Sequence, residues 1–173
     1  MNTIGRPAED EASSYFFRYI DLIEGSDILT LLSTQLDEAL ALFATVSEER
    51  SLYRYAPDKW SIRQVVGHIS DTERIFTFRA LWFARNLSGK LLSFDQDVAV
   101  AHAHAEDIPY YELLTEMRRV REATLSLFQH LPADAWTRSG ISNDHPLTPR
   151  AIAYMCAGHM EHHMRLHRAL YSS

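Results

Sequence analysis

Residues 61–87 read SIRQVVGHISDTERIFTFRALWFARNL, and they contain the best helix start in the chain. It opens with a capping box, in which Ser61 is the N-cap and Gln64 is the third helical residue. Its apolar side chains recur at steps of three and four residues, and the pair Ser88-Gly89 follows as a stop signal. The stretch therefore predicts one long helix with a buried face, and His68 lies on that face.

Three further segments show the same spacing of apolar residues. We expect them to form helices at 27–45, 109–131 and 148–170. Ser26 or Asp27 can cap the first, and Thr148-Pro149 provides a cap and a first residue for the last. Pro109 suits the first position of the remaining one. With six glycines, six prolines and no convincing strand alternation, the chain is predicted to be all-α, a four-helix bundle.

The segments outside the predicted helices differ in character. Residues 1–25 mix aromatic and polar side chains without a sustained period, so we expect an N-terminal arm packed on the bundle. Residues 26–173 then form a single bundle domain. The connection at 91–107 is expected to be the longest, to cross an end of the bundle and to contain a short helical piece. A second polar connection is expected at 134–146.

Composition excludes several classes of protein. The chain has 173 residues, 46% of them apolar and 23% charged, which is typical of one globular domain with a sizeable core. A formal net charge of −6 with scattered basic residues argues against nucleic-acid binding. Cys156 is the single cysteine, so no internal disulfide can form. No leader and no apolar run long enough to span a membrane is evident, and we expect a cytoplasmic protein.

The last predicted helix carries a candidate metal site. His159 and His163 are four residues apart, so they lie about 40° from each other around the helix and can reach one point beside it. His68 faces inward from another helix, and three imidazoles in a bundle core leave one tetrahedral position open. This is the catalytic type of metal site, and imidazole suits zinc, nickel, iron or copper. The competing interpretation is that each ring is an ordinary core histidine with one hydrogen bond.

The neighbours of the histidine pair do not form the known zinc-protease helix. In that motif a glutamate directly follows the first histidine, whereas Met160 occupies this place here. Glu161 is about 200° away from the ligand face, so we do not expect it to act as a base. His162 is also expected to face away, at the surface or in an interface. His167 is an alternative ligand or a supporting residue, one turn beyond His163.

Other residues near these positions have two interpretations each. Cys156 shares the ligand face and could be a soft ligand, but a small buried apolar residue is the favoured interpretation. Carboxylates that could orient ligand histidines, or simply be solvated, are Asp71, Glu73, Asp95 and Asp97. Arg79 could meet an anionic substrate or pair with Asp95 or Asp97.

Two parts of the sequence resemble a known family. Residues 53–74, YRYAPDKWSIRQVVGHISDTER, and 157–163, AGHMEHH, are similar to the DinB family, also called the DinB/YfiT-like metalloenzymes. The likeness includes residues 94–97, FDQD, and spans nearly the whole chain. The resemblance implies a four-helix bundle that holds a divalent metal, usually zinc or nickel, through His68, His159 and His163. It also implies that the protein forms a homodimer.

The resemblance implies less about the reaction. Characterised relatives include transferases and isomerases that use a low-molecular-weight thiol such as bacillithiol, and others carry a hydrolase label. Three inward imidazoles without a protein nucleophile or a placed base favour a metal-dependent transferase that activates a thiol for S-transfer to a small-molecule substrate. One alternative is a metal-dependent hydrolase that uses a water on the metal as nucleophile and needs a carboxylate base. The other is a non-catalytic dimeric bundle that binds a ligand.

Overall fold

The computed structural model describes residues 4–171, so the expected arm at 1–25 and domain at 26–173 extend beyond it by residues 1–3 and 172–173. The helices are α1 (Ser14–Ile20), α2 (Ile28–Phe43), α3 (Ile62–Ala84), α4 (Gln96–Ala103), α5 (Tyr110–Gln129) and α6 (Pro149–Leu170). The strands are β1 (Gly140–Ser142) and β2 (His145–Leu147). Short 3₁₀ turns lie at Glu9–Glu11, Arg50–Leu52, Ala105–Asp107 and Ala133–Thr137. No helix within the described residues has an 18-residue stretch apolar enough to lie across a bilayer.

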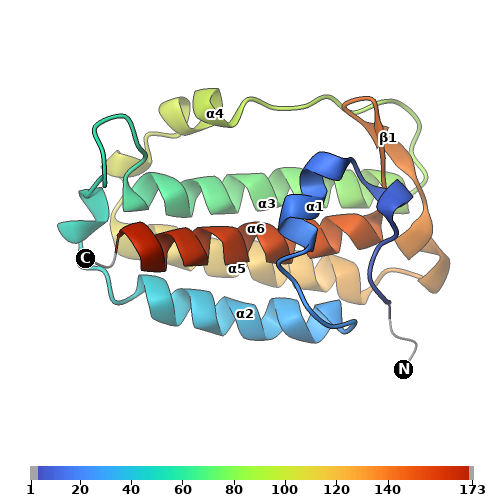
Figure 1. Cartoon of the computed structure of the whole chain (residues 1–173), viewed down its shortest axis with the longest axis horizontal. Coiled ribbons are helices and arrows are strands. Elements are labelled where there is room, and N and C mark those ends of the chain that lie inside the picture. Colours follow the sequence, from blue (N-terminus) through green and yellow to red (C-terminus); the bar gives the residue numbers. More distant parts are fainter. Residues whose placement is uncertain (1–3, 172–173) are drawn as a thin grey trace.

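The four long helices α2, α3, α5 and α6 form the predicted bundle (Figure 1). Both α2 and α3 pack against α5 and against α6. Helices that follow each other along the chain, α2 and α3 or α5 and α6, therefore occupy opposite corners of the bundle. The core consists of two buried clusters, one containing Phe76 and residues 151–157 and the other containing Ile69, Met160 and Met164. The two clusters meet on α6 at the level of His159.

The starts of the helices follow the expected local chemistry. Asp27 caps α2, and Thr148 caps α6 ahead of Pro149. Both halves of the capping box at Ser61 and Gln64 are present at the start of α3. Pro109 precedes α5 as its N-cap rather than being its first residue.

The end of α3 differs from the expectation. The helix stops at Ala84 and not at the predicted Leu87. Asn86 adopts a left-handed conformation with φ of 55°, and the N–H groups of Asn86 and Leu87 donate to the carbonyls of Phe83 and Trp82. This is a Schellman motif, which closes the helix before the expected Ser88-Gly89 signal is reached.

The connections contain more structure than the sequence suggests. The segment expected to be a polar connection at 134–146 contains most of a small antiparallel hairpin, β1–β2, so the expectation of no strand is wrong here. Asn143 and Asp144 form the turn with φ of 49° and 67°, a conformation that asparagine and aspartate tolerate. In the other connection, α4 is the predicted short helical piece. It lies alongside α3 (Figure 1), and its residues Gln96 and Asp97 line a cavity that also borders His68.

The arm reaches the bundle through α1, which packs across α6 (Figure 1). Gly158 permits this approach, because a Cβ at that position would lie 2.1 Å from the backbone oxygen of Tyr19. The close contact brings the side chains of α1 beside the histidines of α6.

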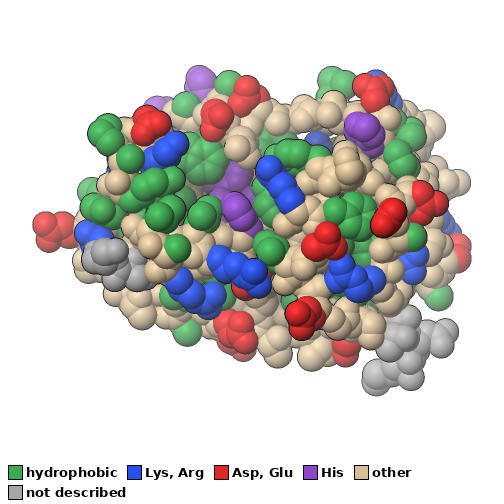
Figure 2. All heavy atoms as spheres, viewed as in Figure 1, with side chains coloured by type: hydrophobic (Ala, Val, Ile, Leu, Met, Phe, Trp, Pro, Cys, Tyr) green, Lys and Arg blue, Asp and Glu red, His purple; other side chains and the backbone are tan. Residues whose placement is uncertain are grey.

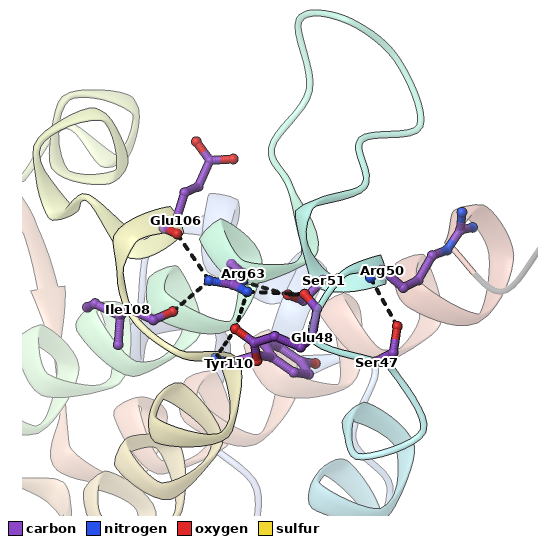
Figure 3. Close-up of polar contacts among 8 residues, drawn as sticks. All are labelled: Ser47, Glu48, Arg50, Ser51, Arg63, Glu106, Ile108 and Tyr110. Carbon is purple, nitrogen blue, oxygen red and sulfur yellow. Dashed lines mark hydrogen bonds and ion pairs between the residues drawn. The ribbon is translucent and has the colours of Figure 1, made fainter.

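Arg63, in the first turn of α3, ties several segments together at the end of the bundle near the candidate site. Its hydrogen-bond partners, shown in Figure 3, are Glu48, Ser51, Glu106 and Ile108. The Glu48 carboxylate also accepts a hydrogen bond from the N–H of Tyr110 at 3.0 Å, and so it caps α5. These contacts hold the two ends of the segment between α2 and α3, whose residues 55–60 pass beside His68.

Candidate metal centre

The structure brings together the three histidines expected from the sequence. His68 comes from α3, and His159 and His163 lie one turn apart on α6. The Nε2 atom of His159 is 3.1 Å from Nε2 of His68 and 3.2 Å from Nε2 of His163. One ligand atom of each residue lies within 4.8 Å of the other two. The three rings are buried, so the prediction that they converge in the core is confirmed.

The separations of 3.1 Å and 3.2 Å from Nε2 of His159 fit a metal held by nitrogen ligands. Zinc–nitrogen bonds of about 2.0–2.1 Å in a tetrahedron place neighbouring ligand atoms about 3.3–3.4 Å apart. The Nδ1 atom of His163 is buried and has no hydrogen-bond partner, so no hydrogen bond at Nδ1 fixes the orientation of this ring. Three Nε2 lone pairs can all be satisfied by one cation, whereas hydrogen bonds among three imidazoles need a proton at one nitrogen of each bonded pair. The donor set therefore fits a divalent metal with a fourth position open.

Burial determines the charge state of the three rings. It lowers the pKa of His159 and His163 well below the ordinary value, and the neighbouring histidines lower both pKa values further. Burial, with a smaller effect of His162, lowers the pKa of His68 to about 4. The imidazoles are therefore neutral near pH 7, which is the protonation state that binds a metal.

Aromatic side chains hold the rings in place, and sequence reasoning missed their role. The ring of Trp60 lies 4.7 Å from that of His68, and the ring of Tyr19 meets His159 edge-to-face at 5.5 Å. Thr72 places its Oγ1 3.4 Å from Nδ1 of His68. Thr72 is one turn from His68 on the same helix face, a spacing visible in the sequence. Tyr19 could not be placed, because nothing local shows where α1 docks.

A cavity of about 580 Å³ opens beside His68 and His163. In Figure 2, histidine atoms lie in a hollow on this face, with hydrophobic side chains around them and basic side chains near the rim. The cavity is bounded by α1, the segment before α3, α4 and α6. Its lining includes Arg18, Lys59, Trp60, His68, Asp97 and His163. It is large enough for a small-molecule substrate.

The remaining α6 candidates lie outside the group of three. Cys156 is fully buried in the apolar core, and burial raises the pKa of its thiol, so the favoured interpretation as a core residue agrees with the structure. His167 is buried and stacks on the ring of Tyr171. Glu161 pairs with Arg165 at 2.6 Å, as expected for a residue that faces away from the site. The expectation for His162 is wrong, because its half-buried ring lines the cavity beside His163.

The expected carboxylates do not orient the histidines. Glu73 forms a buried ion pair with Arg121, and Asp71 pairs with Arg74 at 3.2 Å. Asp95 caps α4 by accepting hydrogen bonds from two backbone N–H groups. Asp97 differs from these, because it lines the 580 Å³ cavity. The sequence offered no way to separate it from the other carboxylates.

Arg79 pairs with neither of its expected partners. Its Nη2 donates instead to the backbone carbonyl of Leu92 at 2.8 Å. The side chain is buried, and it lines a second, smaller cavity that also borders His159.

Comparison with known proteins agrees with the four-helix bundle fold. The chain is similar in structure to YfiT from Bacillus subtilis, described as "a probable metal-dependent hydrolase with an unusual four-helix bundle topology", at a TM-score of 0.67 and 16% identity. The match covers 97% of this chain and 94% of that one. No curated protein matches the sequence. The family model of the DinB superfamily matches residues 31–166. This range contains all three histidines and most of the chain, and the protein belongs to the DinB superfamily.

Proposed function

We propose that the protein is a metal-dependent enzyme in which His68, His159 and His163 hold a divalent metal and a small thiol is activated for S-transfer. The observation that carries the proposal is the meeting of three buried Nε2 atoms, with His68 and His163 lining an open cavity. A metal held by three imidazoles keeps one position open and lowers the pKa of a thiol or water bound there. Zinc and nickel are the metals that we propose.

The cavity supports a role in binding as well as in catalysis. Trp60 provides an apolar wall beside His68, while Arg18 and Lys59 place positive charge at the cavity. Arg18 is held by the hydroxyl of Tyr19 at 2.6 Å. Lys59 pairs with Asp58 at 3.4 Å, whereas Arg18 forms no ion pair within the described residues. Arg18 and Trp60 can therefore bind and orient an anionic small molecule in the cavity, because positive charge and an apolar wall favour such a ligand.

Activation of a thiol is favoured over activation of water, because the carboxylates of α3 are not placed to act as a base at the open metal position. A hydrolase needs a base near the open position, and Glu73 and Asp71 are engaged in ion pairs elsewhere. A thiol needs no such base once its proton is lost to solvent. The hydrolase remains a second candidate on one observation, which is that Asp97 lines the same cavity. The description of YfiT as metal-dependent supports a metal in both cases.

The metal is tested by elemental analysis of protein purified without chelator. We expect close to one zinc or nickel per chain, and less than about a tenth of that after His159→Ala or His163→Ala. His167→Ala is the matched control, since His167 is also a buried histidine of α6 but lies outside the group of three. Circular dichroism checks that each variant is folded. Equal metal content in all these variants would refute the metal site.

The reaction is tested with metal-loaded protein, monochlorobimane and a panel of low-molecular-weight thiols. In the expected reaction the thiolate sulfur forms a bond to carbon, chloride leaves with the bonding electrons, and the thiol proton goes to solvent. We expect fluorescence to rise with at least one thiol and to fall to background in His159→Ala. If no thiol reacts but an ester substrate is hydrolysed, and Asp97→Asn abolishes hydrolysis while metal is retained, the second candidate replaces the first.

A further inference from the structure

Arg79 of α3 is a buried cation that the proposed function does not use. Within residues 4–171 the buried arginines are Arg63, Arg79 and Arg121. Arg63 pairs with Glu48 and Arg121 pairs with Glu73, but Arg79 forms no ion pair with any described carboxylate. Its one hydrogen bond in the described part of the chain goes to the carbonyl of Leu92. Four of its five N–H donors thus remain for another partner.

A lone buried guanidinium is costly, which makes this arrangement informative. Arg79 is only 5% exposed, and removing an ion from water is unfavourable unless an opposite charge compensates for it. Burial lowers the pKa of Arg79, and no charged neighbour contributes to this shift. Because a guanidinium stays protonated in proteins, the charge persists. A bound anion would supply the compensation that the protein lacks.

The space for such an anion lies next to the histidines. Arg79 lines a cavity of about 110 Å³, several times the roughly 30 Å³ that one water molecule occupies in the liquid. His159 forms part of the wall, and Thr72 and Ser93 bring hydroxyl groups. The other walls are mainly aromatic and come from Tyr15, Phe16, Tyr19, Phe76 and Phe94.

This small cavity borders the large one. Tyr19 and Gln96 line both cavities. His68 and His163 line the large cavity, and His159 lines the small one. A ligand could therefore place one group at the open side of the histidines and another against Arg79. A carboxylate matches a guanidinium in shape and charge, and the two commonly form paired hydrogen bonds.

We propose that the cavity at Arg79 is a carboxylate-binding subsite, and that the substrate carries a small carboxylate group. Arg79 provides the charge and Thr72 and Ser93 provide further hydrogen bonds. The assignment of the carboxylate to the substrate of the metal site rests on the proposed function. The binding of a carboxylate at Arg79 does not depend on that function.

The test uses acetate as the probe and full-length, metal-free protein, so that acetate cannot bind to a metal. Saturation-transfer NMR measures acetate binding at constant ionic strength, with acetamide as the uncharged molecule of the same shape. We expect acetate to bind and acetamide not to bind. Arg79→Met should weaken acetate binding about tenfold or more, since a hydrogen-bonded charge is lost. Arg85→Met, which removes an exposed charge just after the same helix, should have no effect.

The stability of the Arg79→Met variant, measured with and without acetate, separates a role of Arg79 in binding from a purely structural role. If Arg79 serves only to hold Leu92, Arg79→Met should unfold at a lower denaturant concentration than wild type with or without acetate. We expect Arg79→Met to be as stable as wild type without acetate, and only wild type to be stabilised when acetate is added. Arg79→Lys, which keeps the charge, should retain weaker acetate binding and serves if Arg79→Met does not fold.

The outcomes distinguish this proposal from the proposed function. Equal acetate binding by wild type and Arg79→Met, or no binding by wild type, overturns the subsite even if the protein holds its metal. If acetate binding depends on Arg79 but the protein cannot hold a metal, the carboxylate subsite is supported. The assignment of that carboxylate to the substrate of a metal-dependent reaction is then overturned.

Discussion

At the scale of single residues, the main polar contact in the core is an ion pair that spans the bundle. Arg121 of α5 is fully buried and forms two hydrogen bonds of 2.8 Å with the carboxylate of Glu73 on α3. Its Nη1 donates to the side-chain oxygen of Gln35 on α2, and Gln35 donates to the carbonyl of Ala157 on α6. One guanidinium therefore connects all four long helices.

Glu73→Gln is expected to lower the free energy of unfolding by about 3–5 kcal/mol, because it leaves the Arg121 charge buried and uncompensated. Chemical denaturation at pH 7 measures the change. The double variant Glu73→Leu with Arg121→Met removes both charges and should recover most of the loss. A single variant within about 1 kcal/mol of wild type would contradict this role for the pair. Metal content should be unchanged in the folded single variant.

The three histidines were predictable and the ion pair was not, for physical reasons. His68, His159 and His163 each lie on an apolar helix face, so local periodicity alone directs them inward. Glu73 looked like one of several carboxylates on α3, because its partner Arg121 is distant in the sequence. Only packing of α3 against α5 brings the two together. The same limit applies to Tyr19 and Trp60, which approach the site from separate segments.

At the scale of elements, local signals predicted where helices begin better than where they end. N-cap residues, the capping box of α3 and the proline that begins α6 act within one turn, so the starts of α2, α3 and α6 followed from the sequence. The end of α3 depended on Asn86 adopting φ of 55°, which asparagine tolerates but does not require. The strands β1 and β2 have three residues each, too few for an alternating pattern to be seen.

The contact between α1 and α6 depends on a single glycine. A Cβ at Gly158 would lie 2.1 Å from a backbone oxygen of Tyr19, which cannot move aside as a side chain could. We expect Gly158→Ala to displace α1 and to cost about 3 kcal/mol of stability through overpacking. Trypsin should then cleave more rapidly after Arg18, which lies on α1. Cleavage and thermal unfolding are measured on the same samples.

Gly67→Ala is the matched control for this variant. Gly67 is also in a helix, but a Cβ there would meet only a side-chain atom, Cβ of Ala105 at 3.3 Å. Alanine favours a helix over glycine by about 1 kcal/mol, which offsets this tighter contact. Unchanged cleavage after Arg18 in Gly158→Ala would show that α1 does not need the close approach.

At the scale of the whole molecule, the first and last parts of the chain are joined by a charged clasp. Glu11 lies in the first 3₁₀ turn, and its carboxylate accepts hydrogen bonds from Arg150 and from the hydroxyl of Thr148, the N-cap of α6. The backbone is joined here too, because the N–H of Thr148 donates to the carbonyl of Glu11 at 3.2 Å. The clasp holds the arm at the start of the helix that carries His159 and His163.

The clasp predicts how stability depends on pH. Burial raises the pKa of Glu11, but hydrogen bonds from Arg150, the N–H of Ala8 and Thr148 outweigh this effect, and the net pKa lies below the ordinary value of 4.5. A carboxyl with a lowered pKa in the folded state stabilises the protein above its unfolded pKa, and this contribution is lost as pH falls through the folded pKa. We therefore expect Glu11→Gln to be less stable than wild type at pH 7 by about 1–2 kcal/mol. The gap should narrow below pH 4.5.

Urea denaturation of wild type and Glu11→Gln between about pH 3 and pH 7 measures this difference directly, since the linkage relation ties the slope to protons bound. Glu9→Gln is the control, because Glu9 is an exposed carboxylate in the same turn and its loss should leave the pH profile unchanged. If Glu11→Gln lost stability equally at every pH, the carboxylate charge would not be the cause. The hydrogen bonds of the protonated Glu11 carboxyl, which glutamine does not reproduce, would then be sufficient to hold the arm on α6.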